Sequence, residues 1–359
     1  MFYNGTGANG LAVIVDARSK LDRQDGGCLD TSRWRHFLGD KEWKRTLRVA
    51  LREHGTEPYR AKGLAEVKSK VSILLREHSI STLLLMQSPA IANVRCVHSA
   101  WNVFGHSGSP YKWAGTVQRK DAYNVCPVLN PANYEDVYEY LIRRWFQQAH
   151  AIACRRITPM PFPRLLHTTP NSDMLSALTD IREGSVSPIA VDIETNTGGT
   201  IITAIGLSNG KATVSTPWDG FPISGTDRHE PPLLSYEHGR DIRRLILECL
   251  RTVNPKILHN GAFDVYELSK RNIHVSNFEY DTLLMHRVAF PQFRHGLQQA
   301  CASLFCIEPW KCLWKPPNTV RGTGEDVWLS DPEAMRVYNA KDAYATWQLY
   351  NHLKQKVGL

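Results

Sequence analysis

A proline-rich stretch divides this chain of 359 residues into two regions and limits what either region can fold into. Prolines stand at positions 159, 161, 163 and 170. Because each proline fixes φ and lacks a backbone N–H, neither a helix nor a central strand can run through this stretch. We therefore expect a first domain over residues 1–156, a linker over 157–172 and a second domain over 173–359.

Charge is distributed unevenly between the two regions. Residues 1–185 contain 25 lysines and arginines against 17 aspartates and glutamates, whereas residues 186–359 contain 18 of each kind, so the whole formal net charge of +8 lies in the first half. Lysine and arginine bind phosphates irrespective of sequence, so a basic domain beside a neutral one is typical of a protein with a polyanionic partner. A merely soluble basic surface fits the charge equally well.

Two classes of protein are disfavoured by simple counts. No apolar run approaches the roughly 20 residues that cross a bilayer, and the run over 11–15 is too short for a signal peptide. The eight cysteines include no C-x-x-C pair, so neither a zinc ribbon nor a disulfide framework is expected. We expect a soluble cytoplasmic protein with reduced thiols and no membrane contact.

Hydrophobic periodicity predicts helices and strands in both regions. In the first region we expect strands at 11–15 and 82–86 and helices at 43–54, 64–78 and 134–152. In the second we expect a strand meander at 188–194, 201–208 and 211–216, a further strand at 256–259, and helices at 239–253, 262–271, 281–289 and 332–355. This order predicts an α/β domain with a mixed sheet, preceded by a smaller α/β domain. The polar segment 218–232 has no assignment.

Two acids interrupt the end of the apolar strand over 188–194. Asp192 and Glu194 are two residues apart, so they lie on the same face of the strand. Like charges so close together repel unless a cation joins them, and hard divalent ions such as Mg²⁺ take oxygen ligands. Taken alone, the pattern is more often a solvated strand end.

Two later elements carry further acids. A glycine follows Asn260 and permits a turn from strand to helix, and Asp264 falls in the first turn of that helix, where N-terminal capping is the ordinary role of an aspartate. Tyr338 and Asp342 are four residues apart in a long helix and share one face, a spacing that taken alone usually indicates a surface pair.

Together, these three elements resemble the motifs of the DEDD superfamily of 3′→5′ exonucleases, in the variant whose third motif is tyrosine-x-x-x-aspartate. The order of the motifs and their intervals of 72 and 78 residues are similar to those in the proofreading domain of family A DNA polymerases, with ribonuclease D as a more distant likeness. The resemblance covers about residues 180–359 and includes the acidic segment 279–285 and the helix expected at 297–304.

The resemblance implies a ribonuclease H-like sheet that holds two divalent metal ions, Mg²⁺ or Mn²⁺. It implies that Asp192 bridges both ions, that Glu194 and Asp342 complete the first, that Asp264 serves the second and that Tyr338 orients the attacking water. The positions that match the family's pocket for the terminal nucleotide are Thr195, Asn260 and Phe263. The apolar wedge that separates the terminal base in the family is missing after the first motif, and its candidate replacements are Phe263, Trp310 and Trp314.

The activity implied is metal-dependent 3′→5′ hydrolysis of DNA to nucleoside 5′-monophosphates. Because the chain stops soon after the third motif, we expect either a free-standing exonuclease or the proofreading part of a split DNA polymerase whose synthetic part is another chain. That arrangement is more familiar from phages, so the expected compartment is the cytoplasm of a bacterium or of a phage-infected host. Two alternatives stay open: ribonuclease D-like trimming of RNA, which uses the same acids, and a nucleic-acid- or polymerase-binding module that no longer cleaves.

The first region offers weaker signals. Trp34, Trp43 and Trp113 stand beside lysines or arginines, a combination that suits stacking on bases. Taken singly, each is somewhat more typical of a core residue flanked by solvated charges. Segments 113–117 and 127–131 resemble uracil-DNA glycosylase-like domains, but Asn130 and Pro131 stand where active members carry a histidine-proline loop. The resemblance implies a degenerate DNA-binding domain without glycosylase activity.

Overall fold

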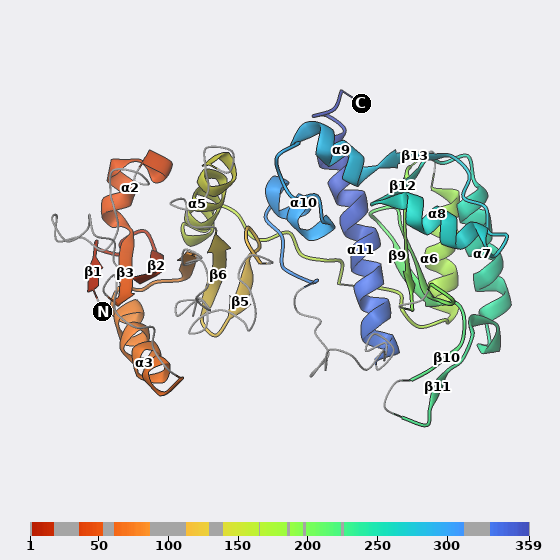
Figure 1. Ribbon diagram of the computed structural model, residues 1–359, viewed down its shortest axis with the longest axis horizontal. Coiled ribbons are helices and arrows are strands. Elements are labelled where there is room, and N and C mark those ends of the chain that lie inside the picture. Colours follow the sequence, from red (N-terminus) through yellow and green to blue (C-terminus); the bar gives the residue numbers. More distant parts are fainter. Residues whose placement is uncertain are drawn as a thin grey trace, which may run out of the picture. The chain divides into compact units, whose positions relative to one another are not determined.

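The computed structural model describes residues 2–17, 36–52, 61–86, 113–128, 139–164, 166–184, 187–196, 199–223, 226–311 and 331–358. The chain divides into two compact units (Figure 1): Met1–Met160 with Phe305–Pro309, and Pro161–Leu304 with Trp310–Leu359. None of the helices in these described ranges combines the length and the apolar character needed to cross a membrane.

The first unit is built on a six-stranded sheet in the order β1-β3-β2-β4-β6-β5. The four inner strands run parallel to one another, while β1 and β5 pair antiparallel at the two edges. The strands are β1 Phe2–Asn4, β2 Leu11–Ala17, β3 Leu47–Arg52, β4 Thr82–Met86, β5 Gln118–Lys120 and β6 Tyr123–Val128. The helices are α2 Asp40–Arg45, α3 Ala61–Glu77 and α5 Glu139–Ala153.

The helix predicted over 43–54 is wrong. Helix α2 ends at Arg45, and Leu47–Arg52 forms strand β3, which pairs in parallel with β2. Leu47, Val49 and Ala50 are all fully buried, as expected of an inner strand that is covered on both faces. A short, continuously apolar run of this kind satisfies helical spacing as well as strand spacing, and pairing with β2 decides between them.

Two of the three tryptophans considered for base stacking belong to the core of this unit. Trp43 and Trp113 are only 2% and 4% exposed, so the stacking interpretation is wrong for both. Trp34 and the Asn130–Pro131 pair lie outside the described residues.

The second unit contains a five-stranded mixed sheet in the order β13-β12-β7-β8-β9. β7, β8 and β9 form the predicted antiparallel meander, and β12 and β13 continue the sheet in parallel with β7. The strands are β7 Ile189–Thr195, β8 Ile202–Ser208, β9 Thr213–Pro217, β12 Lys256–Leu258 and β13 Phe278–Asp281. An antiparallel meander extended by parallel strands is the arrangement of a ribonuclease H-like sheet, and the predicted α/β fold class is confirmed.

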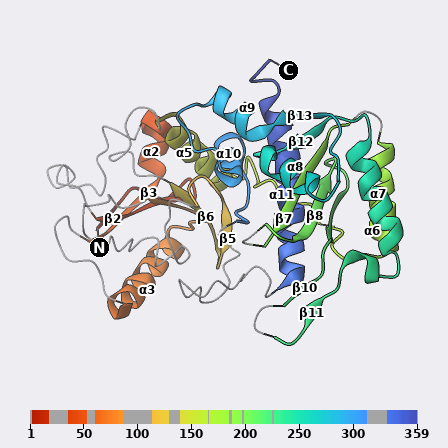
Figure 2. The same ribbon diagram turned by 45° about the vertical axis from the view of Figure 1, so that its right-hand side comes forward.

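Helices cover both faces of this sheet. Helices α6 and α7 pack together on one face, whereas the long helix α11 crosses β7, β8 and β9 on the other (Figures 1 and 2). The helices are α6 Ser172–Glu183, α7 Gly239–Arg251, α8 Gly261–Ser269, α9 Thr282–Ala289, α10 Leu297–Leu304 and α11 Pro332–Leu353. The sequence did not predict α6 or β13.

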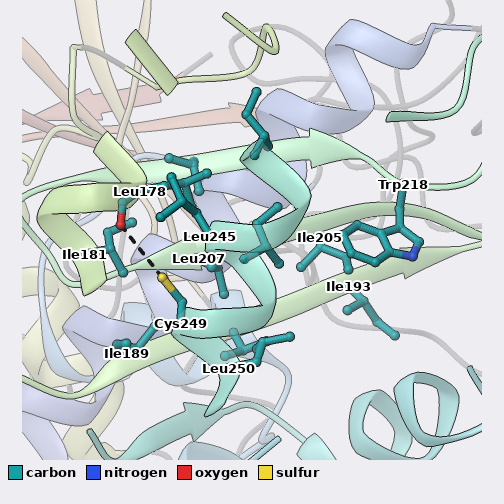
Figure 3. Close-up of a cluster of buried hydrophobic side chains, with 14 of the residues drawn as sticks. Leu178, Ile181, Ile189, Ile193, Ile205, Leu207, Trp218, Leu245, Cys249 and Leu250 are labelled. Carbon is teal, nitrogen blue, oxygen red and sulfur yellow. Dashed lines mark hydrogen bonds between the residues drawn. The ribbon is translucent and has the colours of Figure 1, made fainter. Parts of the chain in front are cut away.

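The core of the second unit lies between the sheet and α6 and α7 (Figure 3). Ile189, Val191 and Ile193 of β7 are buried in it, and the Cys249 thiol of α7 donates to the Leu178 carbonyl oxygen of α6 at 3.8 Å. Since alternate residues of a strand face opposite sides, the side chain at position 192 is directed to the α11 face. One strand thus supplies both the core and the acidic face.

The segment that the sequence left unassigned contains a short hairpin. β10 (Phe221–Pro222) pairs antiparallel with β11 (His229–Glu230), and a 3-10 turn follows at Leu233–Ser235. Glu230 is buried, forms an ion pair with Arg336 of α11 and accepts from the Tyr236 hydroxyl at 3.2 Å. The hairpin therefore fastens the first turns of α11.

Gly206 of β8 lets α11 approach the sheet closely. A Cβ at this position would lie 2.6 Å from Oδ1 and 3.1 Å from the backbone oxygen of Asn339, distances that force α11 or the strand to shift. We expect Gly206→Ala to lower the free energy of unfolding by about 1–3 kcal/mol in urea titrations.

The control for this substitution is Gly296→Ala. Its Cβ would meet only the flexible end of the Gln299 side chain, so a change within about 0.5 kcal/mol is expected. Equal effects of the two substitutions would contradict the close approach of α11 to β8.

Candidate active site

Three carboxylates from two elements converge on the α11 face of the sheet. Ligand oxygens of Asp192 and Glu194 on β7 and of Asp342 on α11 all lie within 4.8 Å of one another. Asp342 is buried and the other two are half-buried. An all-oxygen, acidic and partly dehydrated donor set of this kind fits a hard divalent cation such as Mg²⁺ or Mn²⁺.

Asp264 of α8 lies beside this cluster. Its Oδ1 accepts the Ile193 N–H at 3.0 Å, so the carboxylate is held against the strand segment between Asp192 and Glu194. The N-cap of α8 is Asn260, whose side chain makes no capping bond. Asp264 therefore binds the backbone of β7 and is not the N-cap of α8, the role that its position in the sequence suggested.

Asn339 supports Asp192 and was missed by the sequence analysis. Its amide nitrogen donates to Asp192 Oδ2 at 2.7 Å and to the Asp192 carbonyl oxygen at 3.2 Å, while its Oδ1 accepts the Ser215 hydroxyl at 2.6 Å. The available signal was its position three residues before Asp342, which places both side chains on one face of α11.

Both carboxylate oxygens of Asp342 have donors from the segment 310–311, in which the sequence analysis considered only Trp310, and only as a wedge. The Trp310 indole N–H donates to Oδ1, and the Lys311 ammonium lies 2.5 Å from Oδ2 and 3.0 Å from the Tyr338 hydroxyl. Trp310 is 3% exposed, so its predicted role as a base-separating wedge is wrong. Trp314 lies outside the described residues.

The residues predicted to line a nucleotide pocket lie close to the acids in the chain. Thr195 is the last, half-buried residue of β7. Asn260 adopts a left-handed backbone conformation with φ 64° immediately before α8, and Phe263 on α8 is 46% exposed. An exposed phenyl ring one residue before Asp264 is available for stacking, whereas the nucleotide contacts of all three remain predictions.

Asp281 fixes the start of α8. Its carboxylate accepts the backbone N–H groups of Asn260 and Gly261 at 3.0 and 2.9 Å, and it also caps α9 through Leu283 at 2.9 Å. One carboxylate therefore joins two helix N-termini, and the acidic segment over 279–285 has a structural role beside the site.

The carboxyl groups of Asp192, Glu194 and Asp264 have raised pKa values in the absence of a cation. Loss of water, followed by the charges of Asp342 and Glu194, raises the pKa of Asp192 well above its usual value. Loss of water and the charge of Asp342 raise the pKa of Glu194 to about 8. Burial raises the pKa of Asp264 to about 7, although the Ile193 N–H opposes this shift. Metal binding at neutral pH must therefore displace protons.

Tyr338 and Lys311 have shifted pKa values in the same environment. Burial and the charge of Asp342 raise the pKa of the Tyr338 phenol far above its ordinary value, so the hydroxyl stays protonated. Loss of water lowers the pKa of Lys311, but the neighbouring acids, foremost Asp342, outweigh this and leave its pKa well above the usual value. Lys311 therefore contributes a permanent positive charge.

Comparison with known proteins finds likeness only among solved structures. No protein-family model matches the chain, and no curated protein matches it. A structure described as the apo form of a nuclease is 16% identical and covers 54% of this chain and 79% of its own, with a TM-score of 0.34. Escherichia coli RNase D, an exoribonuclease involved in structured RNA processing, is 17% identical and covers 54% of this chain and 45% of its own, with a TM-score of 0.34. The catalytic core of RRP6 from Trypanosoma brucei is 17% identical and covers 55% and 50%, with a TM-score of 0.35.

The raised pKa values predict how the stability of the metal-free protein depends on pH. Glu194 and Asp264 have folded pKa values of about 8 and about 7 against ordinary values of 4.5 and 3.8, so between about pH 5 and 8 the folded chain binds more protons than the unfolded chain. Rising pH then favours unfolding. We expect the free energy of unfolding in EDTA to fall by at least about 1 kcal/mol over this window.

Urea titrations at pH 5, 6, 7 and 8 measure this slope. Saturating Mn²⁺ should flatten it, and Glu194→Gln should reduce it in EDTA because one titrating group is removed. Stability that rises with pH over the window in EDTA would contradict the protonated cluster.

Proposed function

We propose that this chain is a metal-dependent 3′→5′ exonuclease that hydrolyses DNA to nucleoside 5′-monophosphates. The observation that carries the proposal is the convergence of Asp192, Glu194 and Asp342 within 4.8 Å, with Asp264 bonded to the intervening backbone. These are the four acids of the motif resemblance. A pure binding module has no need of such a cluster, because crowding buried carboxylates without a cation is unfavourable.

The donor set suits divalent ions, and the chain's own acids would hold them. Asp192, Glu194 and Asp342 would bind one ion, and Asp264 together with Asp192 would bind a second. When bound, the ions supply a hydroxide nucleophile at neutral pH and relieve charge on the departing 3′ oxygen.

Other side chains position the reactants. Asn339 and the Ile193 N–H hold Asp192 and Asp264 in fixed orientations, which lowers the entropic cost of assembling the site. The Tyr338 hydroxyl accepts from Lys311 at 3.0 Å and would orient the attacking water. Phe263 offers an exposed ring to the terminal base.

The proposal predicts a ladder that shortens from the 3′ end on 5′-labelled single-stranded DNA with Mg²⁺ or Mn²⁺. Asp342→Asn should reduce the rate at least about 100-fold, because it removes a charged ligand from a set that acts as a unit. EDTA should abolish shortening.

The matched control for this assay is Asp241→Asn. Asp241 is exposed on α7, where it pairs with Arg244 at 3.6 Å, and α7 covers the opposite face of the sheet, so wild-type rates are expected. No shortening with either metal would contradict the exonuclease and favour the binding module.

DNA is proposed as the substrate because the motif intervals resemble those of family A proofreading domains. RNA trimming uses the same acids and differs in acceptance of the 2′-hydroxyl. Side-by-side digestion of DNA and RNA oligomers of one sequence tests the choice of substrate. Faster hydrolysis of the DNA is expected. Faster hydrolysis of the RNA would contradict DNA as the substrate and support RNA trimming.

A DNA polymerase chain is the proposed protein partner, and nucleic acid the proposed partner of the basic first unit. The latter rests on the excess of eight positive charges over residues 1–185. We expect a polymerase to co-purify with the tagged full chain from its native host and to remain bound after nuclease treatment. A monodisperse active monomer that retains none would support a free-standing enzyme instead.

A further inference from the structure

Lys311 contacts Asp342, a carboxylate that the proposed function assigns to a metal ion. Its ammonium lies 2.5 Å from Asp342 Oδ2 and 3.0 Å from the Tyr338 hydroxyl, and 5.1 Å from the centre of the Tyr338 ring. It therefore contacts both residues of the third motif at once, in the way a bound cation would.

The backbone that carries Lys311 is held independently of its ammonium group. Gln298 of α10 is 1% exposed, and its Oε1 accepts the backbone N–H groups of Trp310 and Lys311 at 3.0 and 2.9 Å. The Trp310 indole then donates to Asp342 Oδ1. This second set of contacts keeps the segment in place even when the lysine side chain moves.

The lysine side chain is itself able to move. It is 31% exposed, whereas the Asp342 side chain is 3% exposed, and four flexible methylene groups separate its ammonium from the anchored backbone. A divalent ion bound by Asp192, Glu194 and Asp342 would share Asp342 with this ammonium, and the two positive charges repel each other.

We propose that Lys311 is a positioning residue that orients Asp342 and Tyr338 in the metal-free protein and gives up Asp342 to an incoming divalent ion. This role of Lys311 rests on the proposed function in one respect, namely that a divalent ion binds at Asp342. Lys311 lowers metal affinity because the ion must displace it, and in exchange it keeps the buried carboxylate paired until the ion arrives.

The test is calorimetric titration of the full chain with Mn²⁺ alone, without nucleic acid. Lys311→Met keeps the length of the side chain and removes its charge, and should bind Mn²⁺ at least about 10-fold more tightly than the wild type. Lys354→Met is the matched control, because it removes the same charge from the far end of α11, where Lys354 lies 5.8 Å from the Tyr350 ring. It should bind with wild-type affinity.

A second measurement needs no variant and covers the case in which Lys311→Met fails to fold. Acetylation of amines in the wild type, followed by mass spectrometry, should modify Lys311 slowly in EDTA and several-fold faster with saturating Mn²⁺, while Lys354 stays unchanged. Unchanged or weaker Mn²⁺ binding by Lys311→Met, or labelling of Lys311 that is unaffected or slowed by Mn²⁺, overturns the exchange.

Failure of this inference is distinguishable from failure of the proposed function. A chain that shows the exchange and shortens no oligomer contradicts the exonuclease alone. A chain that shortens oligomers while both Lys311 readouts stay flat contradicts the exchange alone.

Discussion

Mutual repulsion among carboxylates is the constraint on which the second unit depends. Asp192, Glu194 and Asp342 approach within 4.8 Å, and burial together with the negative charge of Asp342 raises the pKa of both Asp192 and Glu194. The fold opposes this repulsion with donors that are themselves fixed: a backbone N–H of β7, an amide of α11 and an indole N–H beside Lys311. A divalent cation would relieve the repulsion that remains among the carboxylates.

The rest of the unit places these donors. The odd-numbered residues of β7 are buried against α6 and α7, which leaves the even-numbered acids facing α11. Helix α11 approaches because Gly206 presents no Cβ to Asn339, and the Glu230–Arg336 pair fastens its first turns to the β10–β11 hairpin. The apolar core on one face of the sheet therefore positions the acidic site on the opposite face.

Local sequence rules predicted much of this arrangement. The two-residue period of β7 put Asp192 and Glu194 on one face, and the meander and the long final helix followed from turn residues and apolar spacing. The same rules failed at Leu47–Arg52, where an inner strand buried on both faces has no alternation to read. Trp310 was one of three candidates for the missing wedge, and a position in a loop does not reveal that its indole is buried against Asp342.

The sequence by itself therefore determined the α/β class, the shared face of Asp192 and Glu194, that of Tyr338 and Asp342, and the order of the motifs. The shared faces depend on the periods of strands and helices. Only the tertiary structure decided that Asn339 holds Asp192, that Ile193 holds Asp264 and that Lys311 lies between Asp342 and Tyr338. These contacts join residues 27 to 147 positions apart. They depend on how closely α8 and α11 pack on the sheet and α10 packs on α11. No period along the chain encodes that distance.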